Sequence, residues 1–383
     1  MNVDSILSHV RANQPGLIAF LKQLVECESP SDDPAAVNRF VELLADSVSP
    51  IARVKTFPGG AYGKHVRCEF HLPGRKKNAK GAILALGHSD TVWPMGTLST
   101  MPWRQQKGRL WGPGVLDMKS GIAFFVFAMR ALRELDLEVG RKVILQLNSD
   151  EEVGSLSSRP LTEKQARQSA AVLVLEPGTG LGGKPKTARK GVGGYRVRVT
   201  GLASHAGVDF AAGASAILEL ARQIEKIRAF TGLDHGVTVN VGLIRGGTRT
   251  NVIAAEASAD VDFRIPRLRD YAALDRRFRR LRSTDSRCRL EITGDLNRPP
   301  MERNAGVVKL FRTAQRLALD LGVVLEESST GGASDGNFTA GLGIPTLDGI
   351  GGVGEGAHAV NESILIDRIA DRTALLAKLV LAS

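Results

Sequence analysis

The sequence is poor in the features that mark several classes of protein. Its three cysteines, Cys27, Cys68 and Cys288, are scattered, odd in number and never arranged as CxxC, which excludes a disulfide framework. No apolar run approaches the ~18 residues that a membrane-spanning helix needs. The N-terminus lacks the basic start and long apolar core of a signal peptide. Together these absences favour a cytoplasmic protein without a membrane partner.

Aromatic residues are also scarce, at 5% of the chain. The formal net charge of +11 raises the question of nucleic-acid binding. However, the stacking residues and motifs of nucleic-acid readers are missing. In Arg276-Arg-Phe-Arg-Arg280, the arginines surround Phe278 and precede Leu281, a pattern typical of the solvated face of an amphipathic helix. We therefore expect no nucleic-acid partner.

The bulk composition is that of a globular protein, with 43% hydrophobic and 24% charged residues. At 383 residues, the chain is too long for one ordinary core and predicts two domains. Neither internal repeats nor a low-complexity tail is visible. The order of the predicted helices and strands must therefore define the domains.

Helical and strand-like segments alternate in the first half of the chain. We expect helices at 17–25, 35–44 and 122–135, and strands at 51–57, 66–72, 81–87, 143–147 and 171–175. The segment 81–87 is almost continuously apolar, as expected of a strand buried on both faces of a parallel sheet. These segments predict an α/β fold, with a mostly parallel sheet flanked by helices.

The pattern changes after about residue 191, where alternating strands indicate a half-exposed antiparallel sheet. Strands at 194–200, 237–244, 257–264 and 288–293, with helices at 211–230 and around 274–281, give a β-α-β-β-α-β order. Helices at 307–321 and 365–381 and a strand at 344–347 then resume the first pattern. We therefore expect a catalytic domain at 1–187 and 301–383, interrupted by a smaller inserted α+β domain at 188–300.

Histidines and carboxylates stand where three successive predicted strands end. His88 and Asp90 follow one strand, Glu151 and Glu152 the next, and Glu176 the third. In open α/β sheets, ligands bind beyond the carboxyl ends of the strands. Two further residues occupy glycine-rich loops, Asp117 before a helix and His358 late in the chain. Histidines and carboxylates without cysteine fit a divalent metal site, with Zn²⁺ the leading candidate.

The same residues lie in an ordered set of motifs that resembles one enzyme family. The motifs are Gly87-His-Ser-Asp-Thr-Val92, Gly112-Pro-Gly-Val-Leu-Asp-Met-Lys-Ser-Gly121, Asp150-Glu-Glu-Val-Gly154, Glu176-Pro177, Ser204-His-Ala-Gly207 and His358. They resemble those of the co-catalytic zinc metallopeptidases related to glutamate carboxypeptidase (carboxypeptidase G), acetylornithine deacetylase, succinyl-diaminopimelate desuccinylase and aminoacylase. The resemblance covers essentially the whole chain and is nearest to the glutamate carboxypeptidase branch.

The resemblance implies two zinc ions per chain, with cobalt or manganese as possible substitutes. One ion would be bound by His88 and Glu176, the other by Glu152 and His358, and Asp117 would bridge them. Asp90 would orient and polarise His88. Two ions ~3.5–4 Å apart can share a hydroxide and polarise a carbonyl. Glu151 would be the general base, which takes a proton from water and delivers it to the leaving nitrogen.

The resemblance also gives roles to the inserted domain, which would form a homodimer and cover the active site. His205 would reach the partner's active site and stabilise the oxyanion. Asn251 and Arg264 would bind a free carboxylate of the substrate, which suits the arginine fork. The loop 331–337 resembles a segment beside the substrate.

Asp117 precedes Met118 where some relatives carry a second Asp, and we expect the peptide bond between them to be cis.

The leading function is hydrolysis of an amide bond next to a free carboxylate, by a carboxypeptidase acting on small peptides or N-acyl amino acids. The nearest alternative is an N-acyl-amino-acid deacylase with the same metal chemistry. A more distant one is a binding protein that kept the fold without catalysis, although the chain retains every expected ligand and the base.

Overall fold

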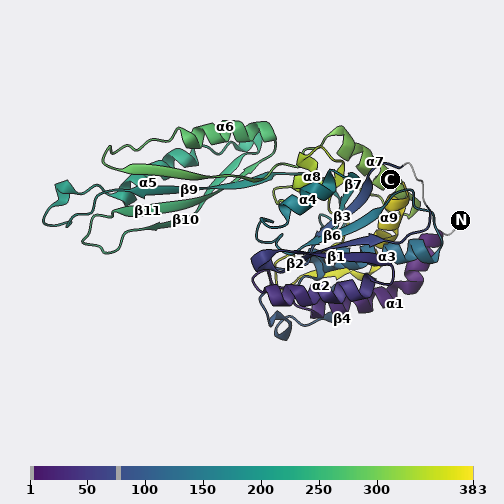
Figure 1. Cartoon of the computed structure of the whole chain (residues 1–383). Helices are drawn as coiled ribbons and strands as arrows, with labels where there is room; N and C mark the ends of the chain where they lie inside the picture. Colours follow the sequence, from purple (N-terminus) through teal and green to yellow (C-terminus); the bar gives the residue numbers. More distant parts are fainter. Residues whose placement is uncertain (1–3, 75–78, 383) are drawn as a thin grey trace. The chain divides into compact units, whose positions relative to one another are not determined.

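The computed structural model describes residues 4–74 and 79–382, which form two compact units (Figure 1). The first unit contains the chain up to Ala188, Arg303–Ser329 and the chain from Ser334. The second contains Arg189–Glu302 and the short segment Thr330–Ala333. The sequence predicts the inserted domain at 188–300 and does not anticipate that Thr330–Ala333 joins it.

The first unit is built around a mixed sheet with the strand order β1-β2-β6-β3-β7-β14. Strands β6, β3, β7 and β14 pair in parallel, whereas β1 and β2 add an antiparallel edge. The bounds are β1 (Ala52–Pro58), β2 (Lys64–Phe70), β3 (Ala82–His88), β6 (Val143–Asn148), β7 (Ser169–Val174) and β14 (Thr346–Leu347). The predicted α/β class with a mostly parallel sheet is confirmed.

Both faces of this sheet are buried, as the apolar run at 81–87 predicts. On β3, Ile83 and Ala85 belong to the main core, while Leu84 and Leu86 belong to a second core on the other face. The two sets alternate because successive side chains of a strand point to opposite faces. A strand with an apolar residue at every position is therefore stable only between two layers of helices.

Helices supply the two layers. The main core contains side chains of α1 (Ser5–Glu26), α2 (Pro34–Val48), α3 (Ser120–Glu134), α7 (Ala305–Asp320) and α9 (Ile369–Ala382). The opposite face packs on α4 (Arg159–Ala166) and the segment after α8 (Gly336–Gly341). The Asp33 side chain caps α2 by accepting from the N–H of Ala36, with Pro34 in the first turn.

Two small sheets lie mainly in the first unit, although Arg189 and Thr330, at the strand ends of one of them, belong to the second. One has the order β15-β16-β5-β4 and pairs chain segments far apart in the sequence, and the other pairs β13 with β8. The bounds are β4 (Arg104–Gln106), β5 (Arg109–Trp111), β8 (Lys186–Arg189), β13 (Ser328–Thr330), β15 (Gly354–Glu355) and β16 (Ser363–Leu365). The pairing of β16 with β5 brings the segment after His358 beside the one before Asp117.

The second unit has the predicted β-α-β-β-α-β order and one antiparallel sheet with the strand order β10-β11-β9-β12. The bounds are β9 (Gly191–Thr200), α5 (Ala216–Arg228), β10 (Thr238–Gly246), β11 (Glu256–Ile265), α6 (Leu268–Arg279) and β12 (Arg289–Arg298). In α6, Leu274 and Phe278 are buried while Arg276, Arg277 and Arg279 are exposed. The basic run is therefore the solvated face of an amphipathic helix, as predicted.

In the described part of the chain, every helix is too short or too polar to cross a membrane.

Candidate metal centre

The parallel strands bring three of the predicted ligand segments to one edge of the sheet. On β3, His88 is the last residue and pairs with Asn148, the last residue of β6. Glu151 and Glu152 come three and four residues after the end of β6, and Glu176 comes two residues after the end of β7. All three segments therefore end on the same side of the sheet, as parallel strands require.

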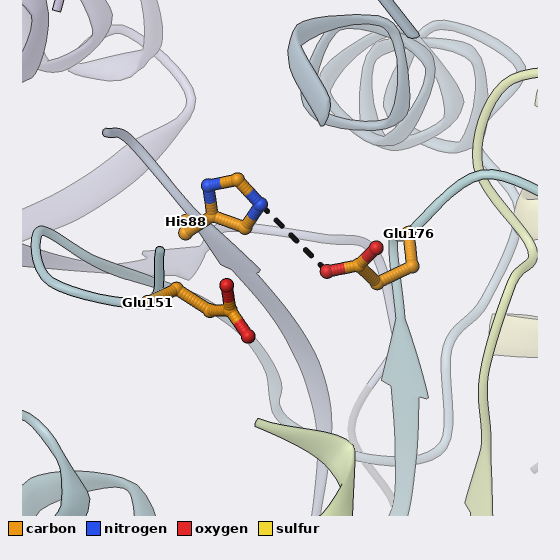
Figure 2. Close-up of side chains that lie close together, drawn as sticks. All are labelled: His88, Glu151 and Glu176. Carbon is orange, nitrogen blue, oxygen red and sulfur yellow. Dashed lines mark ion pairs between the residues drawn. The ribbon is translucent and has the colours of Figure 1, made fainter. Parts of the chain in front are cut away.

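The His88 side chain lies between two carboxylates. It is 2% exposed, and its Nε2 lies 3.2 Å from Oδ1 of Asp117 and 3.7 Å from Oε1 of Glu176. Figure 2 shows the ring directed towards Glu176, with the Glu151 carboxylate nearby. These contacts join the ends of two strands to the loop that carries Asp117.

The other oxygen of Asp117 faces the second predicted histidine. Nε2 of His358 lies 3.3 Å from Oδ2 of Asp117 and 3.3 Å from Oε1 of Glu152. The two oxygens of Asp117 thus point to different histidines, the arrangement that a bridging carboxylate requires. His358 is half exposed and has a φ of 62°, in the left-handed region that non-glycine residues seldom adopt.

The spacing of these atoms fits bound metal ions. Ligand atoms that each lie about 2.1 Å from a tetrahedral zinc are separated by ~3.4 Å from one another. The four histidine–carboxylate distances run from 3.2 to 3.7 Å. The buried Oε1 of Glu152 makes no hydrogen bond within the described residues, although it lies near His358. An acceptor in that position is suited to a cation.

Among the described residues, two groups of potential ligands are compact enough for all their ligand atoms to lie within 4.8 Å of one another. One contains His88, Asp117 and Glu152, and the other contains His88, Glu151 and Glu176 (Figure 2). The predicted base, Glu151, therefore lies among the predicted ligands of one ion. A group that takes a proton from water held at that ion would occupy such a position.

The excess of carboxylates in the centre favours the binding of a positive charge. Burial lowers the pKa of His88, but Asp117, Glu151 and Glu152 outweigh burial and raise it well above the usual value. The nearby carboxylates of Asp117 and Glu152 raise the pKa of His358 to about 10. Although burial opposes it, the two histidines hold the pKa of Asp117 far below its ordinary range. The excess of carboxylates over histidines suits divalent cations.

Asp90 has contacts that the sequence does not reveal. Nδ1 of His88 lies 2.8 Å from the main-chain carbonyl oxygen of Asp90, whereas Oδ1 of the Asp90 carboxylate is 3.6 Å away. The Asp90 carboxylate instead accepts the main-chain N–H groups of Glu151 and Glu152, each at 3.2 Å. Asp90 thus orients His88 through its backbone and the two glutamates through its side chain. Burial raises the pKa of its carboxyl to about 6.

Ser31 is also part of this site, which the sequence does not predict. Its Oγ donates to Oδ2 of Asp90 at 2.8 Å, and its N–H bonds the carbonyl oxygen of Thr91. In the sequence, Ser31 is only a serine in the loop before α2, and this loop is typical of a helix-capping segment. A separation of 59 residues from Asp90 leaves no local pattern to connect the two.

The turn at Asp117 has the predicted backbone: the peptide bond between Asp117 and Met118 is cis. The sulfur of Met118 accepts a hydrogen bond from the N–H of His88 at 3.3 Å. Met118 therefore contacts the end of β3.

The predicted functional residues of the second unit fall into two places. His205 is exposed and pairs with Val252, and the N–H of Ala206 donates to the carbonyl oxygen of Asn251, so His205 and Asn251 lie together. Arg264 lies on β11 and donates from Nε and Nη2 to Asp262, at 2.9 and 3.0 Å. The guanidinium group that the sequence predicts to bind a substrate carboxylate therefore already donates two hydrogen bonds to Asp262.

Comparisons with known proteins identify a family for the chain. The model of peptidase family M20/M25/M40 matches residues 84–382. Carboxypeptidase G2 of Pseudomonas sp. (strain RS-16) is 27% identical over 388 residues, which cover 99% of this chain and 92% of that protein. Succinyl-diaminopimelate desuccinylase of Bordetella petrii is 30% identical over 311 residues, covering 77% and 80%.

The fold is similar to that of aminopeptidase PepT from Bacillus cereus, with a TM-score of 0.78, 23% identity and coverage of 97% of this chain and 99% of that one. An M20 family metallo-carboxypeptidase from Sulfolobus solfataricus has a TM-score of 0.70 at 19% identity, with coverage of 96% and 99%.

Zinc should stabilise the metal-free protein, and Asp117 should be needed for that effect. At a free zinc concentration of ~1,000 times Kd, one site adds about 4 kcal/mol to the free energy of unfolding. We expect Asp117→Ala to lose most of the gain because the two oxygens of Asp117 face both predicted histidine ligands, His88 and His358. Thermal unfolding with and without zinc measures it. Glu42→Ala, which removes an exposed carboxylate of α2, is the control and should keep the gain. Equal stabilisation of Asp117→Ala and the wild type would contradict the bridging position.

Proposed function

The chain belongs to peptidase family M20/M25/M40 and is a hydrolase that acts on amide bonds, and we propose that it cleaves an amide next to a free carboxylate as a zinc carboxypeptidase. The observation that carries this proposal is Asp117, whose two oxygens face the two histidines. Small peptides and N-acyl amino acids are the proposed substrates. The match with carboxypeptidase G2 over 99% of this chain supports the carboxypeptidase branch.

The proposed centre holds two zinc ions, one by His88, Asp117 and Glu176, and the other by Asp117, Glu152 and His358. When bound, the ions polarise the scissile carbonyl and make water acidic enough to act as a nucleophile near neutral pH. The spacing of 3.2 to 3.7 Å between these histidine and carboxylate atoms supports both ligand sets.

Glu151 is the proposed general base. Its carboxylate accepts the proton of the attacking water and then donates it to the leaving nitrogen. The main-chain bond from Glu151 to Asp90 fixes the start of the side chain. The grouping of Glu151 with His88 and Glu176 supports the role, because a base must lie within hydrogen-bond reach of the proton that it removes.

Substrate recognition is assigned to the second unit. We propose that Asn251 and Arg264 bind the free carboxylate and that His205 stabilises the developing oxyanion. Arg264 is only half-buried, so its guanidinium can be shared between Asp262 and a substrate. The exposure of His205 leaves its ring accessible to a ligand.

An N-acyl-amino-acid deacylase is the second candidate, supported by the 30% identity with a desuccinylase. Both enzymes need the same metal ligands and base, so the substrate decides between them. Kinetics on matched panels of N-acyl amino acids, dipeptides and folates separates the two. A carboxypeptidase releases the C-terminal amino acid from peptides and folates. Hydrolysis of simple acyl groups, without release of C-terminal amino acids, would contradict the carboxypeptidase and favour the deacylase.

The neighbouring glutamates provide matched variants for the proposed roles. Glu151→Ala should lower turnover by about 10²–10⁴-fold, the usual contribution of a general base, while zinc content stays near two per chain. Glu152→Ala should lose zinc as well as activity, because its Oε1 faces His358. Metal analysis and kinetics on the same samples test both. Loss of zinc from Glu151→Ala, with retention in Glu152→Ala, would reverse the two assignments.

A homodimer through the second unit is part of the proposal. The edge strand of its sheet, β10, exposes Leu243 and Ile244 at 55% and 60%, and α5 exposes Ile217 and Leu218 at 41% and 57%. An open edge strand with apolar side chains favours pairing with another chain. A second copy of this chain is the proposed occupant, in the cytoplasm, where the three free cysteines stay reduced.

Mixed dimers test whether His205 acts on the partner's active site. Glu151→Ala and His205→Ala homodimers should each be nearly inactive. In a heterodimer, one site would combine an intact Glu151 with the partner's intact His205. After unfolding and refolding as an equal mixture, activity should return to about a quarter of the wild-type value, because half of the dimers are mixed and each has one complete site. An inactive mixture that light scattering shows to contain dimers would place His205 and Glu151 in the same chain's site.

A further inference from the structure

Glu362 is a fully buried carboxylate that the proposed chemistry does not use. Its Oε1 accepts the main-chain N–H groups of Leu116 and Asp117, at 2.8 and 2.9 Å. Its Oε2 accepts the N–H of Gly114 and the indole Nε1–H of Trp93, both at 2.8 Å. The side chain is 0% exposed, so these four donors replace water as its hydrogen-bonding partners.

The four donors come from segments that carry proposed metal ligands. Trp93 lies five residues after His88, and the three main-chain donors belong to the turn that ends in Asp117. Glu362 itself comes four residues after His358, directly before β16. Because Ser363 of β16 pairs with Trp111 of β5, Glu362 lies beside the start of that turn. One carboxylate therefore connects the segments of three ligands.

We propose that Glu362 is a positioning residue, which holds the main chain of Asp117 so that its two oxygens face His88 and His358. The inference rests on the proposed function, in which Asp117 bridges two ions. The most direct support is the bond from the N–H of Asp117 itself, since this bond fixes the peptide unit that begins the ligand. Groups that support metal ligands from behind affect metal affinity as well as stability.

Replacing Glu362 by glutamine, its neutral isostere, is a stringent test of this role. A carboxylate offers acceptors on both oxygens, whereas the glutamine amide offers an acceptor on one side and an NH₂ donor on the other. In either orientation, the NH₂ group of Glu362→Gln would face two N–H donors that now bond one oxygen. A residue needed only to fill space would tolerate the exchange. A residue that holds the turn through these hydrogen bonds would not.

The second unit provides a matched control in Glu219. This carboxylate is also 0% exposed and accepts two main-chain N–H groups, from Thr284 at 2.8 Å and Asp285 at 3.0 Å. It also accepts the side-chain amide of Gln223 and pairs with the exposed Arg222 at 3.4 Å. Glu219→Gln therefore makes the same chemical change at a similarly buried carboxylate remote in sequence from every proposed ligand. A general loss of stability should affect both variants, whereas a loss of zinc affinity should be specific to Glu362→Gln.

The test titrates metal-free full-length protein with zinc against a competing chelator, which reports affinity without measuring activity. Glu362→Gln should bind zinc about 10–100-fold more weakly than the wild type, and Glu219→Gln should bind it as the wild type does. In cobalt-loaded protein, the visible absorption of Glu362→Gln should also change, because it reports ligand geometry. Wild-type zinc affinity in folded Glu362→Gln would overturn the inference and leave the proposed function intact.

Two further outcomes are also decisive. If Glu362→Gln does not fold, Trp93→Phe takes its place, since it removes one donor from Oε2 and leaves the three main-chain donors. It should weaken zinc binding in the same direction by a smaller factor, and unchanged affinity would overturn the inference. A wild-type protein that binds no zinc would overturn both this inference and the proposed function.

Discussion

The parallel pairing of β3 with β6 and β7 is the constraint on which the candidate site depends. It places His88 opposite Asn148 and sets Leu86 opposite Val174. The segments after these strands then carry the remaining ligands of the sheet edge. A slip of one residue in β3 would turn His88 to the other face of the sheet. The apolar cores on both faces oppose such a slip, since it would exchange the side chains that each core accommodates.

The strand register brings several carboxylates close together. These carboxylates fall into two pairs, which differ in what their oxygens contact. At a separation of 4.8 Å, two carboxylates repel by about 3–4 kcal/mol if the effective dielectric constant is ~20. Asp90 and Glu362 lie outside the two groups of potential ligands, and their oxygens accept main-chain N–H groups. Asp117 and Glu152 instead face histidine nitrogens. The first pair holds loops in place, and the second pair is available to cations.

The sequence predicts much of this arrangement because its signals are local. Apolar runs predict the buried strands, and the residues just after them predict the site edge. The cis bond after Asp117 and the β-α-β-β-α-β order are also confirmed. The contacts of Ser31, Glu362 and the segment Thr330–Ala333 could not be predicted in this way, because each depends on residues that meet only in the folded chain. The ion pair of Arg264 with Asp262 is different, because the two residues are two apart on one strand face and such a pair has a local signal.

Asp90 shows why two adjacent glutamates can do different work. Its two oxygens accept the N–H groups of Glu151 and Glu152 separately, so one buried side chain sets both peptide units. The side chains then diverge: Glu151 joins the group of His88 and Glu176, and Glu152 faces His358. A change of the Asp90 side chain therefore disturbs the proposed base and the neighbouring proposed ligand together, whereas the bond to His88 comes from the Asp90 main-chain carbonyl. The roles of base and ligand can therefore be separated only by changing the glutamates themselves.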